Sequence, residues 1–205
     1  AVMHAQTLNQ LRENITSVFL GNAAAVDRVI ACLLTRGHLL IEDVPGVGKT
    51  VLARSLAKSV GGTMSRIQCT PDLLPSDVTG ITVYDRDRNE FRFQPGPVFH
   101  NIVIADEINR ATPRTQSALL EAMAESTVTV DGTTHELPNP FMVVATQNPY
   151  EFEGTYFLPE NQLDRFLMRI SLGYPAPPDE ARVIEQQPAR RELRALGAIM
   201  TPDNL

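Results

Sequence analysis

A glycine-rich run that directly follows a short apolar segment constrains this chain more than any other feature. Residues 38–42 have the pattern of a buried strand, and residues 50–60 have helical periodicity. Between them lies the run Asp43-Val44-Pro45-Gly46-Val47-Gly48-Lys49-Thr50. This order predicts a phosphate-binding loop, because the N–H groups of the loop and the helix dipole create an anion site. The alternative is a glycine-rich turn with an incidental lysine, and the strict motif has Gly where this chain has Asp43.

The residues of this loop have predicted roles toward a nucleotide. Gly46 and Gly48 have no Cβ to block a phosphate, and Lys49 would neutralise the β- and γ-phosphates. Thr50 would place its hydroxyl on Mg²⁺. The predicted nucleotide-binding residues are Asp43, Val44, Pro45, Gly46, Val47, Gly48, Lys49, Thr50 and Val51.

Two further apolar segments end in polar side chains. Residues 102–105 lead into Asp106 and Glu107, for which we predict Mg²⁺ binding and general-base chemistry respectively. The alternative for this pair is a helix cap. Residues 141–146 lead into Gln147 and Asn148, and the Asn148 amide could contact the γ-phosphate or orient a water molecule. The residues alone leave open whether Asn148 instead starts a turn before a proline.

Strands alternate with helices along the chain, which predicts an α/β fold with a mostly parallel sheet and helices on both faces. Capping-box spacing at Thr7–Gln10 predicts the start of a first helix, and Gly21 and Gly37 are predicted to end the first two helices. Thr112 is predicted to cap a helix over residues 113–124. The remaining predicted strands and hairpins cover residues 64–68, 168–171, 81–94 and 127–137. Beyond residue 178 two polar helical stretches, 179–187 and 190–196, form a tail without a core of its own.

Composition excludes several classes of protein. The 205 residues carry a net charge of −6, which argues against a nucleic-acid binder. Two cysteines are too few for a disulfide scaffold, and a reducing, cytoplasmic location fits them. We find no apolar run long enough for a transmembrane segment and expect no signal peptide. His100 and His135 lack partners at metal-ligand spacing, so we interpret them as surface or packing residues.

Several segments together resemble the MoxR family of AAA+ ATPases. These are residues 37–50, 66–80, 96–99, 101–111, 116–123, 145–149 and 158–170, which follow one another in the family's order and span about residues 8–178. The resemblance implies a P-loop NTPase αβα sandwich with a five-stranded sheet and two inserted β-hairpins. One hairpin, 81–94, would interrupt the second core helix, and the other, 127–137, would precede the sensor-1 residue. Such hairpins face the ring channel and touch substrate in related clades.

The resemblance also implies roles for single residues. Asn148 is the sensor-1 residue, and Asp43 is common at its position in such sequences. Arg165 has the place of the arginine finger, which would reach the nucleotide of a neighbouring subunit. A salt-bridge role is the alternative for Arg165, and Arg110 and Arg169 are weaker candidates for the finger. The resemblance divides the chain into a nucleotide-binding core, 1–178, and the helical start of or linker to an absent lid, 179–205.

The function predicted from the residues and the resemblance is hydrolysis of ATP to ADP and phosphate, with Mg²⁺, by a homo-oligomeric ring that is a probable hexamer. The ring would act as a chaperone that remodels or matures partner proteins, including by metal insertion, and a client could carry a von Willebrand factor A domain. Two alternatives stay open. One is a nucleotide-gated binding module with little turnover, and the other is a DNA-translocating motor of the related helicase clade.

Overall fold

A five-stranded parallel sheet forms the centre of the computed structural model, which describes residues 5–43, 48–150, 154–173, 193 and 195–204. Its strands lie in the order β2-β5-β8-β1-β9, and every neighbouring pair is parallel. The bounds are β2 (Met64–Gln68), β5 (Ile102–Asp106), β8 (Met142–Gln147), β1 (Leu39–Glu42) and β9 (Met168–Ile170). This arrangement confirms the predicted α/β fold with a parallel sheet.

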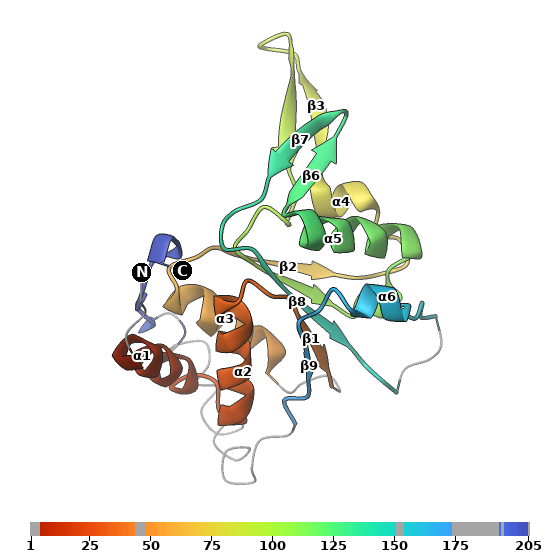
Figure 1. Cartoon of the computed structure of the whole chain (residues 1–205). Helices are drawn as coiled ribbons and strands as arrows, with labels where there is room; N and C mark the ends of the chain where they lie inside the picture. Colours follow the sequence, from red (N-terminus) through yellow and green to blue (C-terminus); the bar gives the residue numbers. More distant parts are fainter. Residues whose placement is uncertain (1–4, 44–47, 151–153, 174–192, 194, 205) are drawn as a thin grey trace.

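Helices cover both faces of this sheet (Figure 1). One face packs against α1 (Ala5–Thr16), α2 (Ala23–Leu34) and α3 (Lys49–Ser59). The opposite face packs against α4 (Pro75–Thr79), α5 (Pro113–Glu125) and α6 (Glu160–Leu163). Two short 3₁₀ segments complete the described helices, η1 (Ile108–Arg110) and η2 (Pro202–Asn204).

The two hydrophobic cores follow from the alternation of side chains along each strand. Leu39 and Ile41 point into the core under α1–α3, whereas Leu40 between them points into the core under α4 and α5. All three are fully buried, and each such side chain stabilises the fold by roughly 1.5–3 kcal/mol. Burial on both faces explains why β1, β5 and β8 are almost continuously apolar and become polar only at their carboxyl ends.

The ends of the first two helices differ from the sequence prediction. Thr7 lies inside α1 and does not cap it, because the helix already includes Ala5, and α1 ends at Thr16, well before Gly21. Helix α2 ends in a Schellman-type turn in which Arg36, with φ 55°, has the left-handed conformation. Gly37 follows that turn, and a Cβ there would collide with the Leu167 side chain. The predicted Thr112 cap of α5 is confirmed.

Two antiparallel hairpins project side by side from the α4–α5 face (Figure 1). They are β3 (Gly80–Asp85) with β4 (Glu90–Pro95), and β6 (Thr127–Val130) with β7 (Thr133–Glu136). Asp131 and Gly132 both have positive φ, as a type I′ turn requires. The His135 ring stacks on Phe93 at 3.9 Å between centroids and so joins the two hairpins. No helix resumes between β4 and β5, so the first hairpin follows the single turn of α4 and does not interrupt a longer helix.

The described part of the C-terminal tail packs on the first core. Met200 is buried there, and the Ile199 N–H donates to the Ser59 carbonyl at 2.7 Å. The Asn14 amide in α1 donates to the Gly197 carbonyl at 3.1 Å. Of the two predicted tail helices, residues 179–187 and most of 190–196 lie outside the described residues. The described helices include none that is long and apolar enough to cross a membrane.

Candidate nucleotide site

The carboxyl ends of β1, β5 and β8 bring the predicted site residues together. These strands are neighbours in the sheet and run in the same direction, so the residues that follow them share one edge. A cavity of about 320 Å³ opens there. Its lining consists of Asp43, Gly48, Lys49, Thr50, Val51, Arg66, Gln68, Asp106, Glu107, Thr146 and Asn148. The predicted loop residues Val44, Pro45, Gly46 and Val47 lie outside the described residues.

The start of α3 forms one wall of this cavity. Gly48 precedes the helix with φ 87°, a left-handed conformation that favours glycine, and a Cβ there would lie 3.2 Å from the buried Phe19 ring. The N-cap residue, Gly48, has no side chain that could bond to the first turn of this 11-residue helix. The first N–H groups of α3 can therefore bind an anion, as helix N-termini do in other phosphate-binding sites.

Lys49 lies at this wall among three carboxylates. Its ammonium donates to the main-chain carbonyl of Asp43 at 2.8 Å. Burial lowers the pKa of Lys49, and the charges of Asp43, Asp106 and Glu107 oppose that shift. Because the ammonium is half-buried and held by a neutral carbonyl, a phosphate arriving in the cavity would offer it a stronger, charged partner.

Asp106 is the most enclosed carboxylate of the site, with 8% of the residue exposed. One oxygen accepts from the Thr146 hydroxyl at 3.1 Å, and the other accepts from Arg66 Nε at 2.6 Å. Arg66 and Thr146 were not among the predicted site residues. Thr146 follows the apolar run of β8, which was an available signal, whereas Arg66 lies in the mixed sequence of β2 and had none. Their convergence on Asp106 depends on the pairing of β2, β5 and β8.

Glu107 directly follows β5 in a left-handed conformation, with φ 55° and ψ 53°. Its N–H donates to the Thr146 hydroxyl at 2.9 Å, and its carboxylate pairs with Arg110 at 3.3 Å. Left-handed backbone is costly for a residue with a Cβ and occurs often at functional sites. Here it turns the chain sharply, so that consecutive carboxylates of Asp106 and Glu107 line the same cavity.

Asn148 forms the turn that was one of its two predicted alternatives, and it also lines the cavity, while its contact with phosphate or water stays a prediction. Its side-chain oxygen accepts the Tyr150 N–H at 3.1 Å, which is an Asx turn, and the residue also lines the cavity. The turn fixes the orientation of the amide, whose NH₂ group is the donor that a phosphate or a water molecule could accept.

The candidate arginines lie in different places. Arg165 is absent from the cavity lining, and its guanidinium donates to the Leu120 carbonyl of α5 at 3.0 Å. Arg169 lies in β9, as expected, with its guanidinium 3.9 Å from the Glu42 carboxylate.

His100 contacts the Pro97 carbonyl at 3.1 Å and His135 stacks on Phe93, in agreement with packing roles. Within the described ranges, no group of three or more His, Cys, Asp or Glu side chains could hold a metal ion.

Comparison with known proteins defines the class to which this fold and site belong. The model of the ATPase family associated with various cellular activities (AAA) matches residues 38–168. A protein assigned as an ATPase in Cytophaga hutchinsonii has a crystal structure that superposes with a TM-score of 0.87 at 41% identity, covering 97% of this chain and 60% of that one. The five-stranded sheet and the two hairpins thus match the fold of a P-loop ATPase.

Curated relatives narrow this class. Uncharacterized protein YeaC of Bacillus subtilis is 52% identical, over 96% of this chain and 62% of its own length. Chaperone MoxR1 of Mycobacterium tuberculosis is 45% identical over 95% and 52%, and protein MoxR of Paracoccus denitrificans is 34% identical over 89% and 55%. The chain belongs to the MoxR family of AAA ATPases. It spans about half to three-fifths of the length of these relatives.

Proposed function

We propose that this chain binds Mg-ATP at the cavity of β1, β5 and β8 and hydrolyses it to ADP and phosphate. The observation that carries the proposal is the convergence of Lys49, Asp106 and Glu107 around one cavity at the N-terminus of α3. Phosphoryl transfer needs positive charge, a carboxylate and a base at one place. The family membership supports the same conclusion.

The donor set of the cavity fits Mg²⁺. This ion prefers oxygen ligands, keeps several waters and usually takes one or two carboxylates besides the phosphates. Asp106 offers a carboxylate and Thr50 a hydroxyl, and both line the cavity. When bound, Mg²⁺ would offset charge on the phosphates. Arg66 occupies one oxygen of Asp106, so its guanidinium would have to share or release that oxygen.

The chain's own groups would divide the remaining work. Lys49 would keep its bond to the Asp43 carbonyl and neutralise the phosphates with its remaining N–H donors, while the first N–H groups of α3 hold them. Glu107 would accept a proton from the attacking water, and its left-handed backbone and the Thr146 hydroxyl fix where that carboxylate begins. The Asn148 NH₂ group would orient the water or the γ-phosphate.

We further propose a homo-oligomeric ring, with six subunits expected, in which Arg165 of one subunit serves the nucleotide of its neighbour. The position of Arg165 outside the cavity of its own subunit is compatible with a role at the neighbour's nucleotide. We also expect the chain to divide into a nucleotide-binding core, 1–178, and the start of a lid, 179–205. The ring would act in the cytoplasm as a chaperone on a protein client. The expected activities are remodelling of the client and metal insertion into it. The expected client carries a von Willebrand factor A domain.

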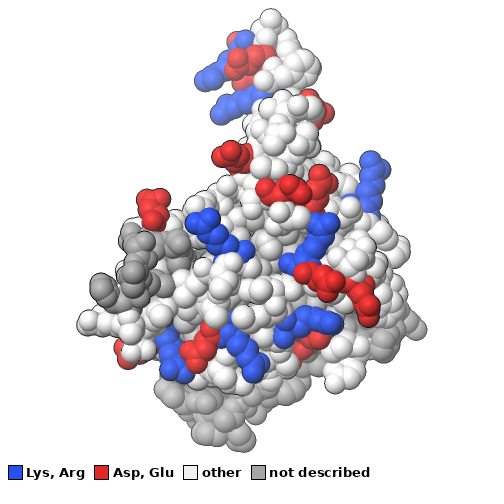
Figure 2. All heavy atoms as spheres, viewed as in Figure 1, with Lys and Arg blue, Asp and Glu red and all other residues white. Residues whose placement is uncertain are grey.

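One observation bears on the DNA-motor alternative. The face in Figure 2 carries acidic and basic side chains interspersed, including at the tip of the longer hairpin, where Asp85, Asp87 and Glu90 accompany the arginines. A phosphate-tracking surface would carry mainly positive charge. The mixed charge favours a protein client over DNA.

Single-turnover hydrolysis in Glu107→Gln tests the proposal and separates it from a nucleotide-gated module. We expect ATP affinity within about threefold of the unchanged protein and a turnover about 10²–10⁴-fold lower, because removal of a general base costs that much. Equal turnover in the two proteins would refute the role of Glu107.

The dependence of turnover on protein concentration tests the role of Arg165. Turnover per subunit that rises with protein concentration would support a role of Arg165 at the neighbour's nucleotide, and a flat, measurable rate would assign it a structural role.

A further inference from the structure

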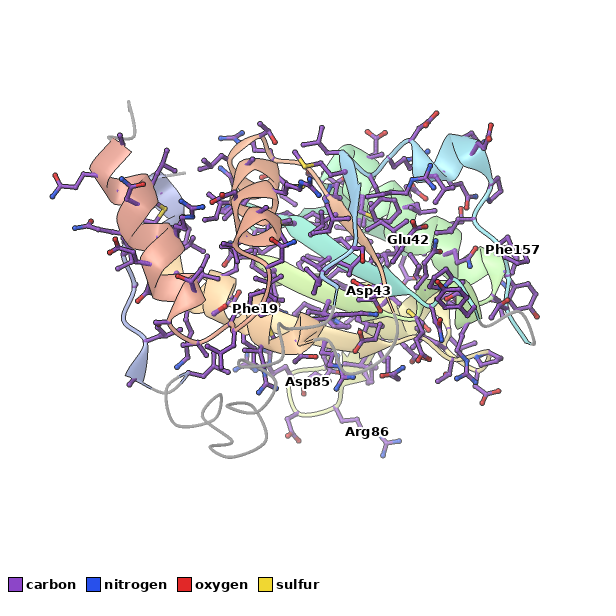
Figure 3. The ribbon with its side chains drawn as sticks, turned by 90° about the horizontal axis from the view of Figure 1, so that it is seen from below. Phe19, Glu42, Asp43, Asp85, Arg86 and Phe157 are labelled. Atoms are coloured by element: carbon purple, nitrogen blue, oxygen red, sulfur yellow. The ribbon has the colours of Figure 1, made fainter. Side chains whose placement is uncertain are left out.

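Asp43 stands where the strict phosphate-loop motif has glycine, so its carboxylate needs a place that the motif does not provide. Figure 3 shows the residue beyond the end of β1. One carboxylate oxygen accepts the Ser171 hydroxyl at 2.8 Å, and the other accepts the Leu172 N–H. Ser171 and Leu172 are the residues that follow β9, at the edge strand of the sheet. The carboxylate therefore holds the exit of the last strand.

The main chain of Asp43 has partners of a different kind. Its carbonyl accepts the Lys49 ammonium at 2.8 Å, and its N–H donates to the Gln147 carbonyl at 3.2 Å, next to Asn148. One residue thus connects the phosphate-binding lysine, the end of β8 and the segment after β9. The link to Leu172 requires the carboxylate of Asp43, because glycine at this position would leave the Leu172 N–H without this acceptor.

We infer that Asp43 is a positioning residue that couples nucleotide occupancy at Lys49 to the segment Ser171–Leu172. The inference rests on the proposed nucleotide binding. The Lys49 ammonium has three N–H donors, so it can keep the Asp43 carbonyl while a bound phosphate fixes both the ammonium and the start of α3. The backbone at Asp43 is then held more firmly, and its carboxylate holds the Leu172 N–H more firmly in turn.

Thermodynamic reciprocity makes the coupling measurable from both ends. If nucleotide slows the opening of the Leu172 N–H by some factor, loss of the anchor weakens nucleotide binding by a comparable factor. The Asp43 carboxylate also repels phosphate, so its removal would strengthen nucleotide binding through charge while weakening it through loss of the anchor. Ser171→Ala removes one hydrogen bond of the anchor and leaves the charge in place, so it separates the two effects.

Amide hydrogen exchange at Leu172, with and without saturating ADP, tests the inference. Without nucleotide we expect Asp43→Gly to raise the exchange rate about tenfold, and Asp43→Asn, which keeps an acceptor oxygen, to raise it less. With ADP we expect the rate to fall at least threefold in the unchanged protein and to stay constant in Asp43→Gly. We expect Ser171→Ala to weaken binding of a fluorescent ADP analogue about twofold.

The outcomes are distinguishable. Equal exchange in the unchanged protein and Asp43→Gly without nucleotide would refute the anchor. Equal slowing by ADP in both proteins would refute the coupling and leave nucleotide binding intact. If the fluorescent analogue fails to bind the unchanged protein, the proposed function fails and the coupling with it, whereas the comparison without nucleotide still decides whether the anchor exists.

Discussion

The nucleotide cavity and the hairpin pair are built in opposite ways. The cavity gathers side chains from segments far apart in the sequence, among them Asp43, Arg66 and Asp106, which neighbouring parallel strands bring together. The hairpins pair residues close in sequence and leave large apolar side chains in solvent, with Phe91 76% and Tyr84 48% exposed. The cavity should therefore depend on individual charged groups, and the hairpins on backbone conformation at their turns and bases.

Replacement of Lys49 should give the largest effect at the cavity, a loss of ATP affinity, and the chain's other lysine provides the control. Lys49→Ala should weaken ATP binding about 100-fold, roughly 2.7 kcal/mol, because a charge-assisted contact to phosphate is lost. Lys58 also lies in α3 but donates to the Leu193 carbonyl, so Lys58→Ala is the matched control, with unchanged affinity expected. Titration with a fluorescent nucleotide measures both. Comparable losses in the two variants would show that the effect is not specific to the cavity.

Two glycines test the dependence of the hairpins on backbone conformation. Gly80 at the base of β3 has φ 101°, and a Cβ there would collide with the Gln94 carbonyl and the Gly96 nitrogen. We expect Gly80→Ala to lower the free energy of unfolding by about 2–3 kcal/mol. Gly132 has φ 78° with open space around it, so Gly132→Ala should cost about 1 kcal/mol from backbone strain alone.

Urea denaturation measures both glycine variants. Equal effects would mean that backbone conformation, and not the close approach at Gly80, decides the cost. A loss of ATP affinity in either variant would break the separation between hairpins and cavity.

His38 gives a smaller, pH-dependent effect beneath the sheet edge. Its Nδ1 accepts the Val143 N–H at 2.9 Å and its Nε2 lies 3.0 Å from the Met123 carbonyl, so the neutral ring satisfies both. Burial lowers the pKa of His38 below its ordinary value of 6.5, and the Met123 contact opposes that shift. The unfolded chain then binds the proton more readily, and stability should fall as pH drops below about 6.5 by at most about 1.4 kcal/mol per pH unit.

Denaturation between pH 5 and 8 measures this slope. His38→Gln keeps a donor and an acceptor but does not titrate, so we expect a shallower slope in that variant. The same slope in both proteins would assign the pH dependence to other groups.

Phe91 should give the smallest effect. Because most of its side chain is already in solvent, Phe91→Ser should change the free energy of unfolding by no more than about 0.5 kcal/mol. A larger loss in urea denaturation would show that the edge contact between the Phe91 and Tyr84 rings stabilises the hairpin and that this surface resembles the core more than its exposure indicates.

Most of the fold was predictable because its signals are local. The apolar run of residues 102–105 lies in β5 and the Asp131-Gly132 turn connects β6 to β7, as predicted, since apolar runs and turn chemistry depend on neighbouring residues. The first helix was less predictable. Capping-box spacing at Thr7 is matched by chance inside α1, and the residues before it also adopt helix. The single turn of α4 is too short to show helical periodicity.

The sequence by itself determined which residues could meet a phosphate, because a strand, a glycine-rich loop and a helix start are contiguous in the chain. It also indicated Asp106, Glu107 and Asn148 as polar ends of apolar strands. Tertiary structure alone decided that Arg66 and Thr146 hold Asp106, and that Asp43 holds the exit of β9. The physical reason is that these contacts depend on strand order and register, which join residues up to 129 positions apart in the sequence.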